Sequence, residues 1–143
     1  MNEVNMDRVR GFAGHIRNAC RELRSLVAGG EEAFLGDSKT ANSAKYLLIV
    51  AAEVALDICN HLVAKRGGRS PEDYADCMAV LGEIGAIDQD LRSRMSRMAR
   101  FRSLLVHLYW KVDDREVFRV AREHLADFDL YLQALGRYLK AEV

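Results

Sequence analysis

Proline is almost absent from this sequence, and none of its cysteines forms a CxxC pair. With Pro71 as the only proline, long stretches lack the residue that most strongly interrupts helices. The ten glycines lie mostly between stretches with helical periodicity, where they would end helices. This distribution favours helices over a β-sandwich or a β-barrel.

A charge excess of either sign is also missing, because 21 Lys and Arg residues balance 21 Asp and Glu residues. Without a net field, a nucleic-acid partner would have to be held by a local basic patch. We see neither an export signal nor an apolar run near the roughly 20 residues that span a bilayer. Cys20, Cys59 and Cys77 are odd in number and far apart. We therefore expect a cytoplasmic protein with buried, reduced thiols and no membrane segment.

Apolar residues recur at steps of three and four through most of the chain, the spacing of amphipathic helices. Breaks at 29–30, 67–68, 85 and 113–114 divide the pattern into five helices. Ser70 is the expected N-cap of the third helix, with Pro71 at its first position. Residues 46–62 are apolar almost all round, which is typical of a central helix or a subunit interface. The sequence therefore predicts an all-α, antiparallel bundle of about five helices, with residues 1–143 in one domain.

The fourth expected helix carries three residues that could perform chemistry near its end: Arg102, His107 and Tyr109. Five residues turn a helix by about 140° and advance it by about 7.5 Å, so Arg102 and His107 are not stacked neighbours, although a long arginine could still reach the same cleft. An imidazole that moves a proton beside a guanidinium that neutralises phosphate charge suits phosphodiester cleavage. On these residues alone, the favoured interpretation is a surface arginine and a histidine that forms a hydrogen bond between helices, because such a pair arises by chance in many helical proteins.

Residues 102–109 resemble the RxxxxHxY motif of the HEPN superfamily, in the branch of HepT-like toxins paired with minimal nucleotidyltransferase (MNT) antitoxins. The resemblance extends from Glu31 to Tyr138 and includes the blocks 53–62, 70–74 and 106–113. It implies a homodimeric toxin of a type II or type VII-like toxin–antitoxin system, with paired motifs facing one cleft. It also implies an endoribonuclease that needs no metal or other cofactor.

The same resemblance assigns roles to individual residues. Arg102 and His107 would be catalytic, and Tyr109 would accept AMP from the antitoxin. An anionic nucleotide beside Arg102 would then occupy the place of an RNA phosphate. The residue after the motif arginine is commonly asparagine in this family, whereas this chain has Ser103, whose reach is shorter. A non-catalytic module that docks and regulates a nucleotidyltransferase, or binds a nucleotide, therefore remains the alternative.

Two further groups of polar residues have open interpretations. Arg94, Arg97 and Arg100 could contact the phosphates of an RNA substrate such as tRNA, or could form a solvated helix face paired with acids. Asp57, Asn60 and His61 follow Glu53 on one side of the second expected helix, where residue types alone would allow a metal. The family resemblance favours a polar network that supports the cleft, and we expect no metal site.

Overall fold

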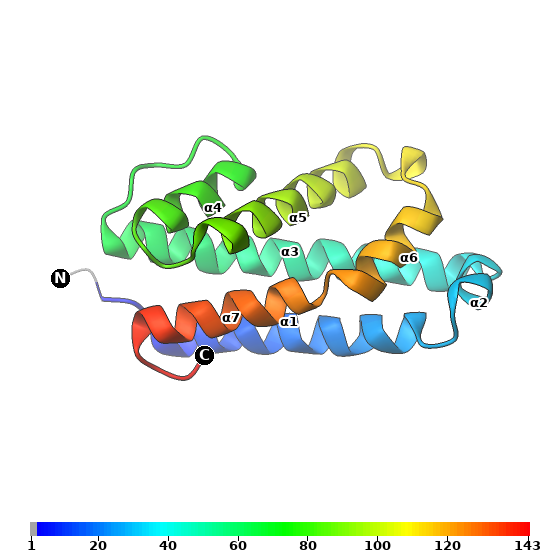
Figure 1. The fold of residues 1–143 in the computed structure, drawn as a ribbon, viewed down its shortest axis with the longest axis horizontal. Coiled ribbons are helices and arrows are strands. Elements are labelled where there is room, and N and C mark those ends of the chain that lie inside the picture. The colour runs from blue at the N-terminus through cyan, green and yellow to red at the C-terminus, as the bar shows by residue number, and fades with distance from the viewer. Residues whose placement is uncertain (1–2) are drawn as a thin grey trace.

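In a computed structural model that describes residues 3–143, the chain folds into helices joined by short connections, and no strand occurs within these residues (Figure 1). The predicted all-α antiparallel bundle is thus confirmed, although the helices outnumber the five expected. They are α1 (Met6–Val27), α2 (Glu31–Leu35), α3 (Ser38–Arg66), α4 (Tyr74–Glu83), α5 (Gln89–His107), the short 3-10 helix η1 (Tyr109–Lys111), α6 (Asp114–Glu123) and α7 (Ala126–Leu139).

Helix α3 is the centre of the bundle and packs against α1, α4, α5 and α6. Its buried alanines, among them Ala51, Ala52 and Ala55, let the neighbouring helices approach closely. By length and composition α3 could cross a membrane, so the expectation that no segment approaches that length is wrong. Half of its most apolar window is buried inside the bundle, as in the core helix of a globular protein.

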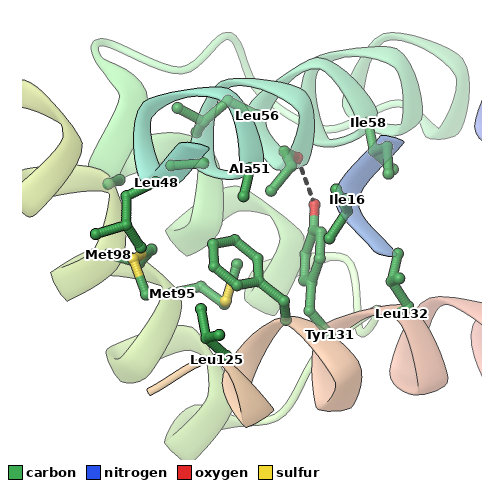
Figure 2. Close-up of a cluster of buried hydrophobic side chains, with 14 of the residues drawn as sticks. Ile16, Leu48, Ala51, Leu56, Ile58, Met95, Met98, Leu125, Tyr131 and Leu132 are labelled. Carbon is green, nitrogen blue, oxygen red and sulfur yellow. Dashed lines mark hydrogen bonds between the residues drawn. The ribbon is translucent and has the colours of Figure 1, made fainter. Parts of the chain in front are cut away.

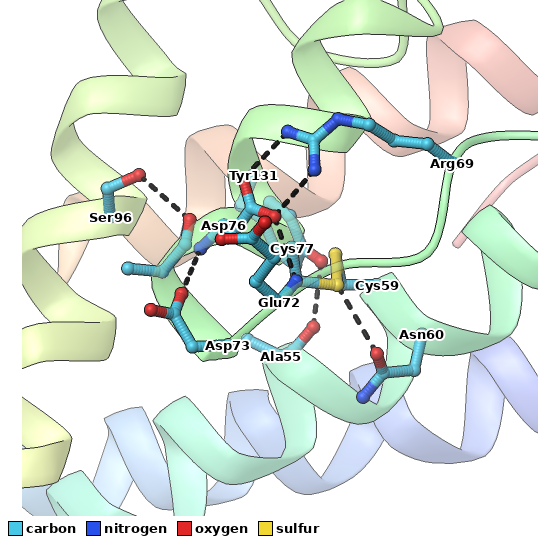
Figure 3. Close-up of a disulfide and its surroundings, with 11 residues drawn as sticks. Ala55, Cys59, Asn60, Arg69, Glu72, Asp73, Asp76, Cys77, Ser96 and Tyr131 are labelled. Carbon is cyan, nitrogen blue, oxygen red and sulfur yellow. Dashed lines mark hydrogen bonds and ion pairs between the residues drawn. A yellow bond between two sulfur atoms is a disulfide. The ribbon is translucent and has the colours of Figure 1, made fainter.

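The α3–α4 connection differs from the sequence prediction at the start of the fourth helix. The N-cap is Asp73, whose carboxylate accepts the backbone N–H of Asp76 at 2.7 Å, so Ser70 and Pro71 lie in the preceding loop. A carboxylate at an N-cap also interacts favourably with the helix dipole, which explains why the helix starts there. Arg69 then ties the loop to α4 by hydrogen bonds to Asp76 (Figure 3) and to Glu83.

The last expected helix is divided into α6 and α7 at residues 124–125. The two parts bury their apolar faces against different neighbours: α6 contacts α1, α2 and α3, whereas α7 contacts α1 and α5. The chain must change direction between these two packing positions, although the spacing of its apolar residues hardly changes. Tyr131 of α7 lies in the core, where its hydroxyl donates to the carbonyl oxygen of Ala55 at 2.8 Å (Figure 2). Burial raises the pKa of Tyr131, so this donor stays protonated.

Two of the three cysteines are paired, which corrects the prediction of three reduced thiols. Cys59 of α3 and Cys77 of α4 form a disulfide with a Cα–Cα distance of 6.3 Å (Figure 3). The helix–loop–helix hairpin brings them face to face, although 18 residues separate them. Cys20 is a buried free thiol, and burial raises its pKa to about 11.

Candidate active site

Arg102 projects from α5 into the interior of the bundle and is only 9% exposed. Its Nε donates to Glu53 Oε2 of α3 at 2.5 Å, and its guanidinium carbon lies 4.3 Å from the ring centroid of Tyr74. The ion pair and the cation–π contact hold the guanidinium from two sides. Within the described residues no hydrogen bond uses Nη1 or Nη2, so both terminal nitrogens keep donor capacity for a ligand.

His107 is the last residue of α5 and is exposed. It lines an open hollow of about 610 Å³ together with Tyr74 from the start of α4 and Arg100, Ser103 and Leu104 from α5. Ser103 lies one helical turn before His107 on the same wall, so its hydroxyl shares the hollow with the imidazole. We call this cavity the His107 hollow.

Arg102 and His107 face different sides of α5, as their spacing predicts. Arg102 turns toward Glu53 on α3, whereas His107 opens to the hollow beside α4. Tyr74 connects the two, because its ring stacks on Arg102 and also lines the His107 hollow. One chain thus supplies one imidazole, with Arg100 in the same hollow and Arg102 adjoining it across Tyr74.

Tyr109 follows α5 in η1 and touches the N-terminal half of α3. Its hydroxyl donates to Asn42 Oδ1 at 3.0 Å, and the Lys45 ammonium lies 4.5 Å from its ring centroid. Lys45 is itself paired with Asp114 at 3.0 Å. The cation in contact with Tyr109 is therefore Lys45, whereas the sequence interpretation placed Arg102 beside an AMP group on this hydroxyl.

The polar residues of α3 have separate partners. Glu53 pairs with Arg102, Asn60 Oδ1 lies 3.4 Å from Cys77 Sγ, and His61 Nε2 accepts the backbone N–H of Asn5 at 3.0 Å. Burial and the neighbouring Glu53 raise the pKa of Asp57, whereas burial and nearby cations lower the pKa of His61. No group of three or more His, Cys, Asp or Glu residues in the described part of the chain is arranged to hold a metal.

The arginines of α5 differ in how far they are neutralised. Arg94 pairs with Asp90 at 2.9 Å and with Asp127 at 3.1 Å, as the paired-face interpretation expects. Arg97 and Arg100 are exposed and have no ion pair within residues 3–143. These two remain candidates for RNA phosphates, and Arg100 already lies at the edge of the His107 hollow.

Sequence reasoning missed two residues of this site. Glu53 was predicted to belong to a metal or polar cluster on its own helix, and Tyr74 to a segment of family resemblance. Neither was predicted to contact Arg102. Both meet Arg102 across long sequence separations, 49 residues in the case of Glu53, and no periodicity within one helix encodes such a contact. The one signal that could have predicted such a contact is that a buried guanidinium needs an acidic partner.

Two curated relatives and one solved structure resemble this chain over much of its length. The mRNA nuclease HepT of Shewanella oneidensis is 22% identical over 135 residues, which cover 94% of this chain and 98% of that protein. The tRNA nuclease HepT of Aphanizomenon flos-aquae is 27% identical over 94 residues, 65% of this chain and 63% of the relative. A solved structure of a tri-AMPylated Shewanella oneidensis HEPN toxin in complex with MNT antitoxin superposes with a TM-score of 0.85 at 22% identity, covering 92% of this chain and 98% of the other.

A family model described as ribonuclease HepT-like matches residues 16–135. This range contains α3, α4 and α5, and with them Glu53, Tyr74, Arg102, His107 and Tyr109. The match confirms the resemblance that the sequence motif indicated. The chain belongs to the ribonuclease HepT-like family.

Proposed function

We propose that this protein is the RNA-cleaving toxin of a toxin–antitoxin pair and that it acts as a homodimer. The observation that carries the proposal is the family match over residues 16–135, a range that includes Arg102 and His107. The named relatives are nucleases of mRNA and tRNA, which supports RNA as the substrate class. An RNA substrate and an ATP-using antitoxin would place the protein in the cytoplasm.

The chemistry that fits the site is transfer of the phosphodiester to the neighbouring ribose 2′-hydroxyl. One imidazole removes the 2′-hydroxyl proton as the oxygen attacks phosphorus, and a second protonates the departing 5′-oxygen. The Arg102 guanidinium would offset the charge that gathers on the non-bridging oxygens. These groups supply the proton transfers and the positive charge without a metal or another cofactor.

A homodimer would supply the second imidazole, because each chain carries one His107. The end of α5 and the turn after it expose apolar side chains around this histidine: Leu104 is 47% exposed, Val106 42% and Trp110 75%. Neighbouring exposed apolar residues are typical of a surface covered by a partner protein. A second copy of the chain packed against this apolar surface would bring both histidines to one cleft.

Cleavage by the purified protein tests the proposal directly. We expect transfer RNA or total RNA to be cut at the same rate with and without EDTA, and expression without the antitoxin to arrest growth. Size-exclusion chromatography with light scattering should give the mass of two chains. A monomer that cuts no RNA and leaves growth unchanged would contradict the proposal and favour a module that docks the nucleotidyltransferase.

Tyr109→Phe is expected to abolish AMP transfer to the toxin, because the change removes the hydroxyl that would accept AMP. The measurement is intact-mass spectrometry after incubation with the MNT-type partner and ATP. Tyr46→Phe is a matched control, since Tyr46 is 65% exposed and lies on neighbouring α3. The Tyr46 variant should gain the wild-type number of AMP groups. Equal adducts on the Tyr109 variant would show that another residue accepts AMP.

A further inference from the structure

A second hollow, distinct from the His107 hollow, lies where α5 meets α6 and α7. It encloses about 360 Å³ and includes the apolar side chains of Met98, Phe101 and Val120. Arginines 94, 97 and 119 line the same hollow. Its volume lies at the lower end of ligand pockets, roughly 300–1,000 Å³, which suits one aromatic ring system with a small polar attachment.

The charges around this hollow leave one cation free. Arg94 is neutralised by Asp90 and Asp127, and Arg119 pairs with Glu116 at 2.5 Å and with Glu123 at 3.5 Å. Arg97 has no ion pair within the described residues. Four carboxylates oppose three arginines here, so Arg97 offers the one unpaired contact for an anion. A ligand with one negative charge and an apolar, flat body therefore fits better than a polyanion does.

The arginines are held in place without a ligand. Asp127 is only 4% exposed and binds Arg94, and its second oxygen lies 3.7 Å from His124 Nδ1. His124 Nε2 lies 3.1 Å from Arg119 Nη1. Because a guanidinium only donates, this contact assigns the lone pair to Nε2 and the proton to Nδ1, facing Asp127. The network fixes Arg94 and Arg119 and leaves Arg97 free to bind a ligand.

One stripe of α5 connects this hollow with the His107 hollow. Arg97, Arg100, Leu104 and His107 follow one another at spacings of three, four and three residues, so they share a helix face. Arg97 and His107 are ten residues apart, about 15 Å along the axis. Arg97 and Arg100, two arginines of α5 without an ion pair in the described residues, thus lie on the path that an RNA strand would take from His107.

We propose that the second hollow binds one nucleotide of the RNA strand beyond the cleavage site. The base rests on Phe101, Met98 and Val120, and the phosphate is bound by Arg97. This inference rests on the proposed ribonuclease function, because it extends the substrate path of that site. A phosphodiester carries a single charge, which matches the single free cation, and a base provides the flat apolar body.

Salt-dependent binding of a short single-stranded RNA tests the phosphate contact. The probe carries 2′-O-methyl riboses, so that no 2′-hydroxyl can attack and binding is measured without cleavage. Arg97→Glu should weaken binding at least about tenfold and reduce the slope of log K against log salt by about 0.7, the loss of one single-strand phosphate contact. Arg21→Glu makes the same charge change on the exposed surface of α1 and should keep the wild-type slope.

A probe with one abasic position tests the base contact. Moving that position along the strand should reveal one site, apart from the cleavage position, where loss of the base weakens wild-type binding about tenfold. Phe101→Leu keeps an apolar side chain but removes the ring, so this penalty should disappear in that variant. Thermal unfolding verifies that the variant is folded.

The outcomes separate the two proposals. Equal binding by the Arg97 and Arg21 variants, or an abasic scan without any sensitive position, would overturn the second hollow as a nucleotide site while RNA binding itself stands. If the wild-type protein binds no RNA at any salt concentration, the ribonuclease proposal fails, and the nucleotide site fails with it.

Discussion

His107→Ala is expected to lower the rate of RNA cleavage by at least about 10²-fold, since positioned proton transfer contributes roughly 10²- to 10⁴-fold to catalysis. The imidazole lines the His107 hollow and is exposed, and it forms no hydrogen bond within the described residues. Its removal should therefore leave packing intact. The free energy of unfolding should stay within about 0.5 kcal/mol of the wild-type value, as for other surface substitutions.

Initial rates on a defined RNA in EDTA, with unfolding in urea measured in parallel, provide the comparison. His15→Ala is the matched control, because His15 is an exposed histidine on α1, away from the hollow. That variant should cut at the wild-type rate. If the His107 variant also cuts at that rate while folded, His107 is not a proton-transfer group and the cleft lies elsewhere.

The helices follow from the sequence where local chemistry decides them. Asp37 and Asp88 cap α3 and α5 by accepting backbone N–H groups at 3.0 and 2.8 Å, and Asp88 follows closely on the break that the sequence predicts at residue 85. Tertiary packing decides the rest. The break after α6 comes from two different sets of neighbours. The Cys59–Cys77 bond depends on the angle between two helices, which no spacing encodes.

The candidate site likewise has residues that the sequence predicts and surroundings that only the fold shows. Arg102, Ser103, His107 and Tyr109 can be found in the sequence, because the family motif lies within one short segment. The environment of each residue comes from other helices: Glu53 and Tyr74 for Arg102, Asn42 and Lys45 for Tyr109. Likewise, the five arginines of α5 are alike in sequence, and only the fold shows that Asp127 neutralises Arg94 while Arg97 and Arg100 stay free.

Arg102→Ala is expected to reduce cleavage at least about 10²-fold and also to lower the free energy of unfolding. The loss of activity follows because the Arg102 guanidinium would no longer offset the negative charge that develops on the phosphate. The loss of stability, about 2–3 kcal/mol, follows because Glu53 keeps a partly buried carboxylate without its partner and Tyr74 loses the group stacked on its ring. Cleavage rates and urea unfolding of the same preparation measure both effects.

Two further variants separate catalysis from folding. Arg102→Lys keeps a positive charge near Glu53, so it should recover much of the stability, but a compact ammonium cannot bind Glu53 and a phosphate through separate nitrogens. It should therefore remain poorly active. Glu53→Gln keeps an oxygen that can accept from Arg102 Nε and removes only the carboxylate charge, so it should retain most of the cleavage. Wild-type rates in both Arg102 variants would instead show that this arginine only supports the packing between α3 and α5, and that His107 acts with another cation.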